Sequence, residues 1–316
     1  MSSVTSARPW AIVSARYLAA WGISNSGDRV VIGLTDITPS LRRAAAAAFG
    51  NRAELTVMQR PYGDVYRYKA RSVPRLIKVR NSAAVRSDTC SRLMDCTPRI
   101  GGDRIVRHAG STVYECTASW SWANKPYKGG SDAVTTAGHC SSTGTTWLQG
   151  YYDPAKNTIY YTGSAGKDVL TSWGNNRADG EVLKGVDWNP EIYYTNSRYG
   201  LTIGYNQPME NEVVCADGSF TGKSCNGLVQ NPDECAKISD GGTTVRVCDL
   251  AYATSDHRLS QPGDSGGPVW AQNTISPPQF PACGLISAGN NSGTELYFSD
   301  MSGLEHALHG VPTIAP

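Results

Sequence analysis

The sequence contains no Cys-x-x-Cys pair, and no cysteine precedes Cys90, although nine cysteines lie between Cys90 and Cys283. The missing short-spaced pairs argue against a structural zinc site, whose ligands are usually grouped in that way. His306 and His309 lie three residues apart, which is more typical of a terminal helix than of a ligand pair. We therefore expect no metal and no cofactor. The cysteines predict disulfide cross-links and a secreted, extracellular protein.

Long apolar runs are also missing. No stretch of 18 or more apolar residues occurs, so we expect no membrane span and no membrane partner. The weakly apolar residues 11–21 are interrupted by Arg16 and do not form a signal peptide. Secretion is thus inferred from the cysteines alone. Only four phenylalanines accompany 33 glycines, 16 tyrosines and 8 tryptophans, which suits a loop-rich secreted β protein.

The net charge is only +2, but the two signs are separated along the chain. Residues 1–99 carry 16 Lys/Arg and 6 Asp/Glu, whereas residues 100–316 carry 13 and 21. Two solvated surfaces or a basic nucleic-acid-binding arm would each explain this contrast. We favour a third explanation, in which the basic and acidic parts dock on each other, and we expect no nucleic acid partner.

Residues 1–80 have the pattern of a small α/β module. Strands are predicted at residues 29–34 and 54–59, with a helix between them at 40–49 that includes five consecutive alanines. Thr38 suits the N-cap of this helix, and Gly50 suits its C-terminal end. The module is too small to be stable alone, so we expect it to pack against the rest of the chain.

The remaining chain is divided into a connector at residues 81–99 and a β-rich domain at residues 100–316. Short apolar runs in the second part alternate with Gly, Asn and Asp turns, which predicts antiparallel barrels or a sandwich rather than βαβ units. A closing helix is expected near residues 302–309. The strand candidates are residues 133–136, 158–162, 191–195, 245–248, 268–270 and 284–287.

The octapeptide at residues 262–269, Pro-Gly-Asp-Ser-Gly-Gly-Pro-Val, brackets Ser265 with glycines. Such a loop exposes the hydroxyl and leaves backbone N–H groups free to stabilise an oxyanion, which are the needs of an acyl-transfer nucleophile. A simple tight turn is the alternative, because Gly-Asp and Ser-Gly are ordinary turn dipeptides. The functional interpretation requires a base and an orienting carboxylate elsewhere in the chain.

A base is available in residues 136–140, Thr-Ala-Gly-His-Cys, at the end of an apolar strand. This motif, followed by Gly-Asp-Ser-Gly-Gly-Pro at residues 263–268, resembles the trypsin/chymotrypsin superfamily, specifically its secreted, streptogrisin-like bacterial branch. The resemblance implies two antiparallel six-stranded β-barrels and a serine endopeptidase that cleaves protein or peptide substrates through an acyl-enzyme. His139 would be the base and Ser265 the nucleophile.

The acid is expected between these two motifs, at the start of an apolar strand. Asp179, in Asp-Gly-Glu-Val-Leu, fits best; Asp168 is second and Asp187 third. Asp179 would hold the imidazole tautomer and offset the imidazolium charge. The backbone N–H groups of Gly263 and Ser265 would form the oxyanion hole.

Two other functions fit part of this pattern. Gly-Asp-Ser-Gly-Gly also satisfies the α/β-hydrolase elbow of an esterase, whose acid and histidine follow the serine. That interpretation would use Asp300 with His306 or His309 and would leave His139 unexplained. A catalytically silent binding protein on the protease scaffold is the second alternative, although such a protein would normally have lost its serine or histidine.

The substrate pocket is expected from residues just before the catalytic serine and from the strand Ser287-Ala288-Gly289. Streptogrisin-like proteins usually carry a cysteine at the position of Leu259, so the pocket wall lacks its usual cross-link. None of residues 259–262 is acidic, so we do not expect a preference for Lys or Arg. Asp264 resembles the residue that anchors the oxyanion loop through an ion pair or hydrogen bond.

The cysteines suggest four disulfides, with Cys283 left over as a buried free thiol. Two pairs follow from the resemblance and two from proximity along the chain: Cys116–Cys140 and Cys215–Cys225, then Cys235–Cys248 and Cys90–Cys96.

The start of the protease-like part also follows a family pattern. Residues 99–103, Arg-Ile-Gly-Gly-Asp, resemble the superfamily's activation junction, where cleavage after a basic residue frees an Ile or Val amine. A simple turn before the first strand is the alternative. We interpret residues 1–80 as a propeptide that acts as a folding aid or intramolecular inhibitor.

Overall fold

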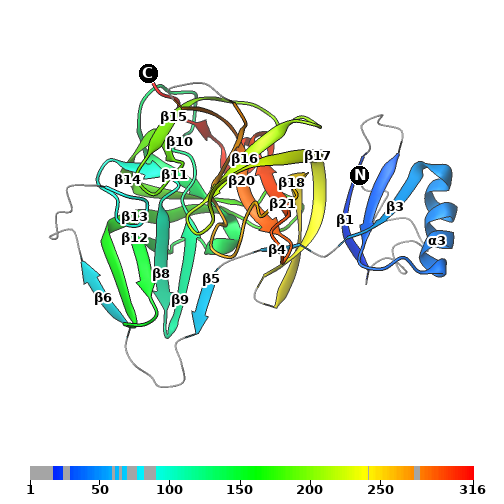
Figure 1. The fold of residues 1–316 in the computed structure, drawn as a ribbon, viewed down its shortest axis with the longest axis horizontal. Coiled ribbons are helices and arrows are strands. Elements are labelled where there is room, and N and C mark those ends of the chain that lie inside the picture. The colour runs from blue at the N-terminus through cyan, green and yellow to red at the C-terminus, as the bar shows by residue number, and fades with distance from the viewer. Residues whose placement is uncertain are drawn as a thin grey trace.

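The N-terminal module contains one helix packed on a three-stranded sheet (Figure 1). The structure is a computed structural model, and it describes residues 17–23, 29–58, 61–63, 66–69, 77–81, 90–240, 242–273 and 278–316. The expected helix is confirmed as α3, Pro39–Phe49, with the Thr38 side chain accepting a hydrogen bond from the Leu41 N–H. The elements are β1 Leu18–Ile23, β2 Val30–Leu34, α3, η1 Gly50–Arg52 and β3 Ala53–Val57.

The module buries its own apolar cluster, and β1 joins it to the rest of the protein. β1 pairs with β2 on one edge, while its other edge pairs antiparallel with β17, Gly222–Asp240. Leu41 and Phe49 of the helix pack against Trp21 and Ile32 of the sheet. The sequence prediction missed β1, because its apolar residues lie beside Arg16 and have neither the spacing of a strand nor that of a helix. β1 is stabilised instead by the pairing of both its edges with neighbouring strands.

The first barrel is closed and antiparallel, with its strands linked in the spatial order β9, β8, β12, β13, β14, β11. Backbone hydrogen bonds between residues 119–121 and β11 complete the ring. Its core contains the buried tryptophans Trp120, Trp147 and Trp188. The strands are β8 Arg104–Ala109, β9 Thr112–Thr117, β11 Ser131–Thr136, β12 Thr146–Asp153, β13 Thr158–Ser172 and β14 Gly180–Tyr193.

The second barrel is a closed ring in the order β16, β17, β18, β21, β20, β19, and β19 pairs back with β16. Together the barrels form the chymotrypsin-like fold that the sequence predicts (Figure 1). Val214, Ile286 and Phe298 lie in its core. The other strands of this ring are β16 Val213–Gly218, β18 Thr243–Thr254, β19 Pro268–Ala271, β20 Gln279–Gly289 and β21 Glu295–Asp300.

The remaining elements connect or cover the barrels. The closing helix, α4, spans Met301–Leu308, and the Asp300 side chain caps it by accepting the Gly303 N–H. No helix among the residues described above is long and apolar enough to cross a bilayer. The other elements are β4 Tyr62–Gly63, β5 Tyr66–Lys69, β6 Lys78–Asn81, β7 Arg99–Gly101, β10 Trp122–Ala123, η2 Gly138–Cys140, β15 Tyr199–Tyr205 and β22 Val311–Pro312.

Candidate active site

His139 lies in the short 3-10 turn η2, directly after β11 of the first barrel. The adjacent Cys140 forms a disulfide with Cys116, which ties this turn to the end of β9. A Cβ at Gly138 would lie 2.1 Å from the carbonyl oxygen of Ser172, so only glycine permits this close approach of the two backbones. The histidine is therefore held by both a covalent bond and backbone packing, and it is only 6% exposed.

Asp179 precedes β14 and is completely buried. One carboxylate oxygen accepts the backbone N–H of His139 at 3.0 Å, and the other lies 2.6 Å from His139 Nδ1. The Ser287 hydroxyl donates to that second oxygen at 2.6 Å. The Asp179 N–H donates to the Ser299 hydroxyl, which in turn donates to the Asp179 carbonyl. These bonds fix both the backbone and the carboxylate of the expected acid.

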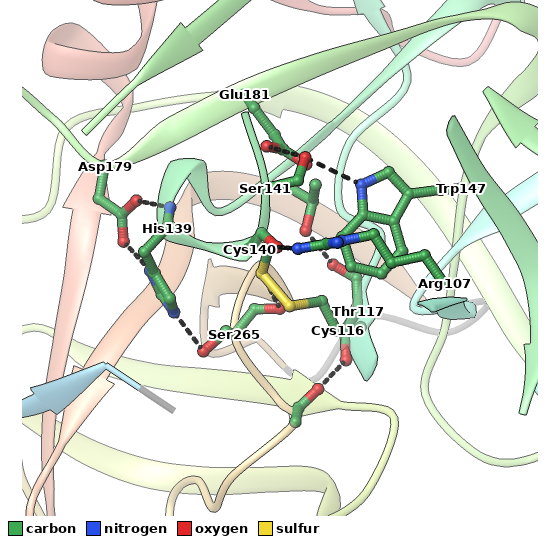
Figure 2. The surroundings of a disulfide bond; sticks show 12 residues. Arg107, Cys116, Thr117, His139, Cys140, Ser141, Trp147, Asp179, Glu181 and Ser265 are labelled. Carbon is green, nitrogen blue, oxygen red and sulfur yellow. Dashed lines mark hydrogen bonds and ion pairs between the residues drawn. A yellow bond between two sulfur atoms is a disulfide. The ribbon is translucent and has the colours of Figure 1, made fainter. Parts of the chain in front are cut away.

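Ser265 comes from the second barrel, in the loop between β18 and β19. Its Oγ lies 2.8 Å from His139 Nε2, on the opposite side of the ring from Asp179 (Figure 2). Its carbonyl accepts the Thr117 N–H at 2.9 Å, which links the serine loop to the first barrel. The Trp173 ring lies 5.1 Å from the imidazole. The structure thus brings together the three residues expected to be acid, base and nucleophile.

Asp264 is buried beneath the serine loop. It accepts hydrogen bonds from the backbone N–H groups of Phe220, Thr221 and Gln261, and from the Thr221 hydroxyl. Burial raises the pKa of this carboxyl, and the hydrogen bonds partly offset the effect. Asp264 therefore anchors the loop by hydrogen bonds, one of the two ways suggested by the sequence.

The backbone at Gly263 has the open geometry expected beside a nucleophile. Its φ is +94°, a region that favours glycine, and a Cβ there would lie 2.3 Å from the Phe220 ring. Within the described chain, the N–H groups of Gly263 and Ser265 donate to no other group. They remain available as hydrogen-bond donors next to the Ser265 hydroxyl.

The residues expected to line the substrate pocket differ in their surroundings. Leu259 is wholly buried in the core of the second barrel, so its side chain reaches no surface. Ser287 points its hydroxyl at Asp179 rather than into a pocket. Ala288 and Gly289 follow it on β20. A Cβ at Gly289 would lie 3.1 Å from the Ser260 Oγ, so Ser260, which the sequence prediction did not single out, faces this strand.

The alternative acids lie away from His139. Asp168 is buried beside Ser141 and Thr171, and Asp187 is exposed. The acid of the α/β-hydrolase alternative, Asp300, caps α4. The histidines of that alternative are exposed at positions 306 and 309, and the antiparallel barrels differ from its parallel sheet.

Four disulfides are present, and they join the pairs expected from the sequence. Cys283 is unpaired and buried, with its sulfur 3.4 Å from the Asn206 side-chain oxygen. Burial raises the pKa of its thiol to about 12. Cys283 is thus held as a neutral thiol away from solvent.

The suggested activation junction between Arg99 and Ile100 is buried in this structure. Arg99 is only 2% exposed, and its guanidinium donates to the Ser164 and Asp95 carbonyls. The Ile100 N–H donates to the Asp95 carboxylate. Nearby, Arg92 is buried and forms a two-point ion pair with Asp217 of β16. The end of the expected connector, residues 90–99, is therefore part of the protease-like body.

The sequence prediction also missed a buried polar cluster behind the histidine turn. Glu181, Ser141 and Trp147 form a hydrogen-bonded chain, and Arg107 donates to the Cys140 carbonyl (Figure 2). The only sequence signal was the position of Glu181, two residues after Asp179. That signal is weak, because the alternation of apolar and polar residues along a strand does not show which loop a side chain contacts.

Two closed antiparallel barrels, with serine, histidine and aspartate at their junction, are the arrangement of the chymotrypsin-like serine proteases. A curated relative is similar to part of the chain. The chain is 28% identical to streptogrisin-C of Streptomyces griseus over 185 residues, which are 57% of this chain and 35% of streptogrisin-C. It is similar to the streptogrisin-like members of the trypsin/chymotrypsin superfamily.

Two similar solved structures are distant from this chain in sequence. Protease A of Thermobifida fusca is 22% identical, with a TM-score of 0.49, over 68% of this chain and 98% of that one. The Cellulomonas bogoriensis chymotrypsin is 21% identical, with a TM-score of 0.48, over 67% and 97%. No protein-family profile matches the chain.

Proposed function

We propose that this protein is a secreted serine endopeptidase that hydrolyses peptide bonds through an acyl-enzyme. The observation that carries the proposal is the buried chain of contacts Ser265–His139–Asp179, at 2.8 and 2.6 Å. Ser265 Oγ attacks the substrate carbonyl carbon as His139 Nε2 takes its proton, and His139 then returns the proton to the leaving amine. Asp179 stays ionised and holds the ring.

The oxyanion of the tetrahedral intermediate is stabilised by the N–H groups of Gly263 and Ser265. Loss of one such donor costs about 3 kcal/mol of transition-state stabilisation. Asp264, which lies between these two residues in the chain, supports the proposal. Its carboxyl group accepts hydrogen bonds from the backbone N–H groups of Phe220, Thr221 and Gln261 and so fixes the loop. The four disulfides support an extracellular site of action.

Covalent labelling with a fluorophosphonate tests the proposal. We expect the wild-type chain, freed of its leader, to be labelled at Ser265 and to hydrolyse casein, and Ser265→Ala to do neither while its thermal unfolding is unchanged. Ser292→Ala, at an exposed serine, is the control and should behave like the wild type. A folded wild type that neither reacts nor cleaves would support the silent binding protein. An esterase of the elbow type would retain activity in His139→Ala.

We further propose that the N-terminal module is an intramolecular inhibitor of this site. β4 pairs antiparallel with β20, where Tyr62 lies opposite Gly289 and Gly63 opposite Ala288. β5 pairs antiparallel with β9, where Tyr66 lies opposite Glu115. In the first contact, the β20 residues directly follow Ser287, whose hydroxyl donates to Asp179. In the second contact, Glu115 of β9 directly precedes Cys116, which forms the disulfide with Cys140. The leader therefore occupies one strand edge on each barrel, and both edges adjoin residues of the proposed site.

Only three peptide units connect Gly63 to Tyr66, and they span at most about 10 Å. A peptide substrate that pairs with these same two edges would place its scissile bond between them, above the serine. We therefore propose that the leader is cut between Gly63 and Tyr66 rather than at the buried Arg99. The pairing of β1 with β17 would hold the cut leader on the enzyme until that sheet separates.

A further inference from the structure

Glu181 is a buried carboxyl that the proposed chemistry does not use. It lies on β14, two residues after Asp179, and none of its surface is exposed. Across the β11–β14 pair it lies opposite Thr136, at the point where the chain leaves the sheet toward His139. Its carboxyl group lies next to Ser141, at the end of the turn that carries the proposed base, as Figure 2 shows.

Ser141 connects Glu181 to that turn. Its hydroxyl donates to Glu181 Oε2 at 2.9 Å and accepts the Trp147 indole N–H at 3.2 Å. Ser141 directly follows Cys140, the disulfide partner of Cys116, and lies two residues after His139. The carbonyl of Cys140 accepts a bond from Arg107 at 3.2 Å. The turn is therefore held by one carboxyl group at Ser141 and one guanidinium at Cys140.

The surroundings of Glu181 favour its neutral form. Burial is the largest influence and raises its pKa well above the ordinary range, and the nearby charges of Asp168 and Asp179 act in the same direction. The Ser141 hydroxyl also lies 3.4 Å from Asp168 Oδ2, so the buried carboxyl groups of Asp168 and Glu181 meet at one hydroxyl. Two carboxyl groups this close are not readily ionised together, and the pKa of Glu181 is raised further than that of Asp168, so Glu181 holds the proton.

No ion pair involves Glu181 in the described chain, since the Arg107 guanidinium stacks on Tyr114 and bonds the Cys140 carbonyl. If Glu181 lost its proton, three buried carboxylates, those of Asp168, Asp179 and Glu181, would lie together without a matching cation. Such an arrangement is strongly unfavourable. Repulsion among these carboxylates would move the Ser141 side of the turn.

We propose that protonated Glu181 is a positioning residue, which holds His139 in place relative to Ser265 and Asp179 by accepting the Ser141 hydroxyl. This inference rests on the proposed protease function. Ionisation of Glu181, as the pH rises through its raised pKa, releases the turn, so activity then falls through loss of geometry rather than through titration of the histidine. The charged or titratable groups that face the cluster are Asp168 on β13, Asp179 and His139 beside it, and Arg107 on β8.

The test compares two substitutions on the leader-free enzyme. In Glu181→Gln the amide oxygen accepts from Ser141 as the protonated acid does, and the side chain cannot ionise. We expect its kcat to match the wild type at pH 7 and its alkaline decline to move to higher pH. Glu181→Ala should lower kcat by roughly 100-fold at all pH values with KM little changed, as a misplacement near 1 Å would. Glu191→Gln, at a half-buried glutamate on the same strand, is the matched control.

A Glu181→Gln enzyme with the wild-type alkaline limb would overturn the inference, whether or not Glu181→Ala folds. Infrared spectroscopy gives a readout independent of turnover: the wild type should show a protonated carboxyl band at pH 8 that Glu181→Gln lacks and Glu191→Gln keeps. Absence of that difference also overturns the inference. Failure of the proposed function itself is recognised separately, because a folded wild type would then not react with a fluorophosphonate.

Discussion

His139 and Asp179 are joined at two points, since one oxygen of the carboxylate accepts the histidine backbone N–H at 3.0 Å and the other lies 2.6 Å from ring Nδ1. The first contact fixes where the histidine sits, and the second fixes how its ring is turned. A carboxylate that accepts at both points leaves Nδ1 protonated and Nε2 free to accept the proton of Ser265.

Replacement of Asp179 by Asn should therefore lower kcat by about 10⁴-fold at neutral pH. The amide preserves most of the shape but favours the wrong tautomer and does not offset the imidazolium charge. Steady-state kinetics on a peptide ester and a peptide amide measure the loss. Asp187→Asn, at an exposed aspartate of the following strand β14, should be neutral. If Asp179→Asn retained a tenth of the wild-type kcat, the assignment of the acid would be wrong.

The new N-terminus formed by self-processing should fall between Gly63 and Tyr66. Incubation of the full chain, followed by N-terminal sequencing and intact mass, locates the cut. Ser265→Ala should stay whole. Arg99→Gln should be processed at the same place but be less stable by about 1–3 kcal/mol, because the buried carbonyls that Arg99 satisfies lose their donor. An N-terminus at Ile100 would restore the junction that the sequence suggested.

Leader release should increase as the pH rises. Glu234 lies opposite Gly22 of β1 and lines a cavity of about 310 Å³ between the leader and the second barrel. Burial, together with Asp233 and Glu295, raises its pKa to about 8. Where docking of the leader raises the pKa of Glu234, docking also takes up a proton. The affinity of the enzyme for its leader is then at its full value below the ordinary pKa of a free glutamate. The affinity declines as the pH rises to about 8, by at most tenfold per pH unit.

Gel filtration of the processed complex at constant ionic strength measures this effect, as the fraction of leader that remains bound at pH 6 and at pH 9. Glu54 of β3 and Tyr252 of β18 line the same cavity, so Glu234→Gln is needed to isolate the contribution of Glu234. That variant should lose most of the pH dependence. An unchanged pH dependence in Glu234→Gln would assign the release to another group.

Thiol titration should detect one free cysteine under denaturing conditions and almost none in the native protein. Cys283 is buried, and its raised pKa keeps the unreactive neutral form at physiological pH. Ellman's reagent with and without guanidinium makes the measurement, and Cys283→Ala, which should give none, is the control. Three free thiols after denaturation would mean that one of the four disulfides does not form in solution.

Features carried by contiguous residues were readable from the sequence. The helix at residues 40–49, with Thr38 as its cap, follows from local propensity and is confirmed. The two motifs around His139 and Ser265 predicted the class of fold through resemblance, and the closed barrels agree with it. These predictions succeed because turn chemistry, capping and long motifs depend on neighbours in the chain.

Features that depend on distant contacts required the tertiary structure. Arg99 looks like an accessible cleavage site in the sequence, but its burial is decided by strands that come sixty residues later. Glu181 resembles any strand glutamate until folding buries it against Ser141. Ser265 is the opposite case: its motif predicted a reactive serine, and the fold added only the distance to His139. Burial and charge environment are properties of assembled neighbours, which no local pattern of residues encodes.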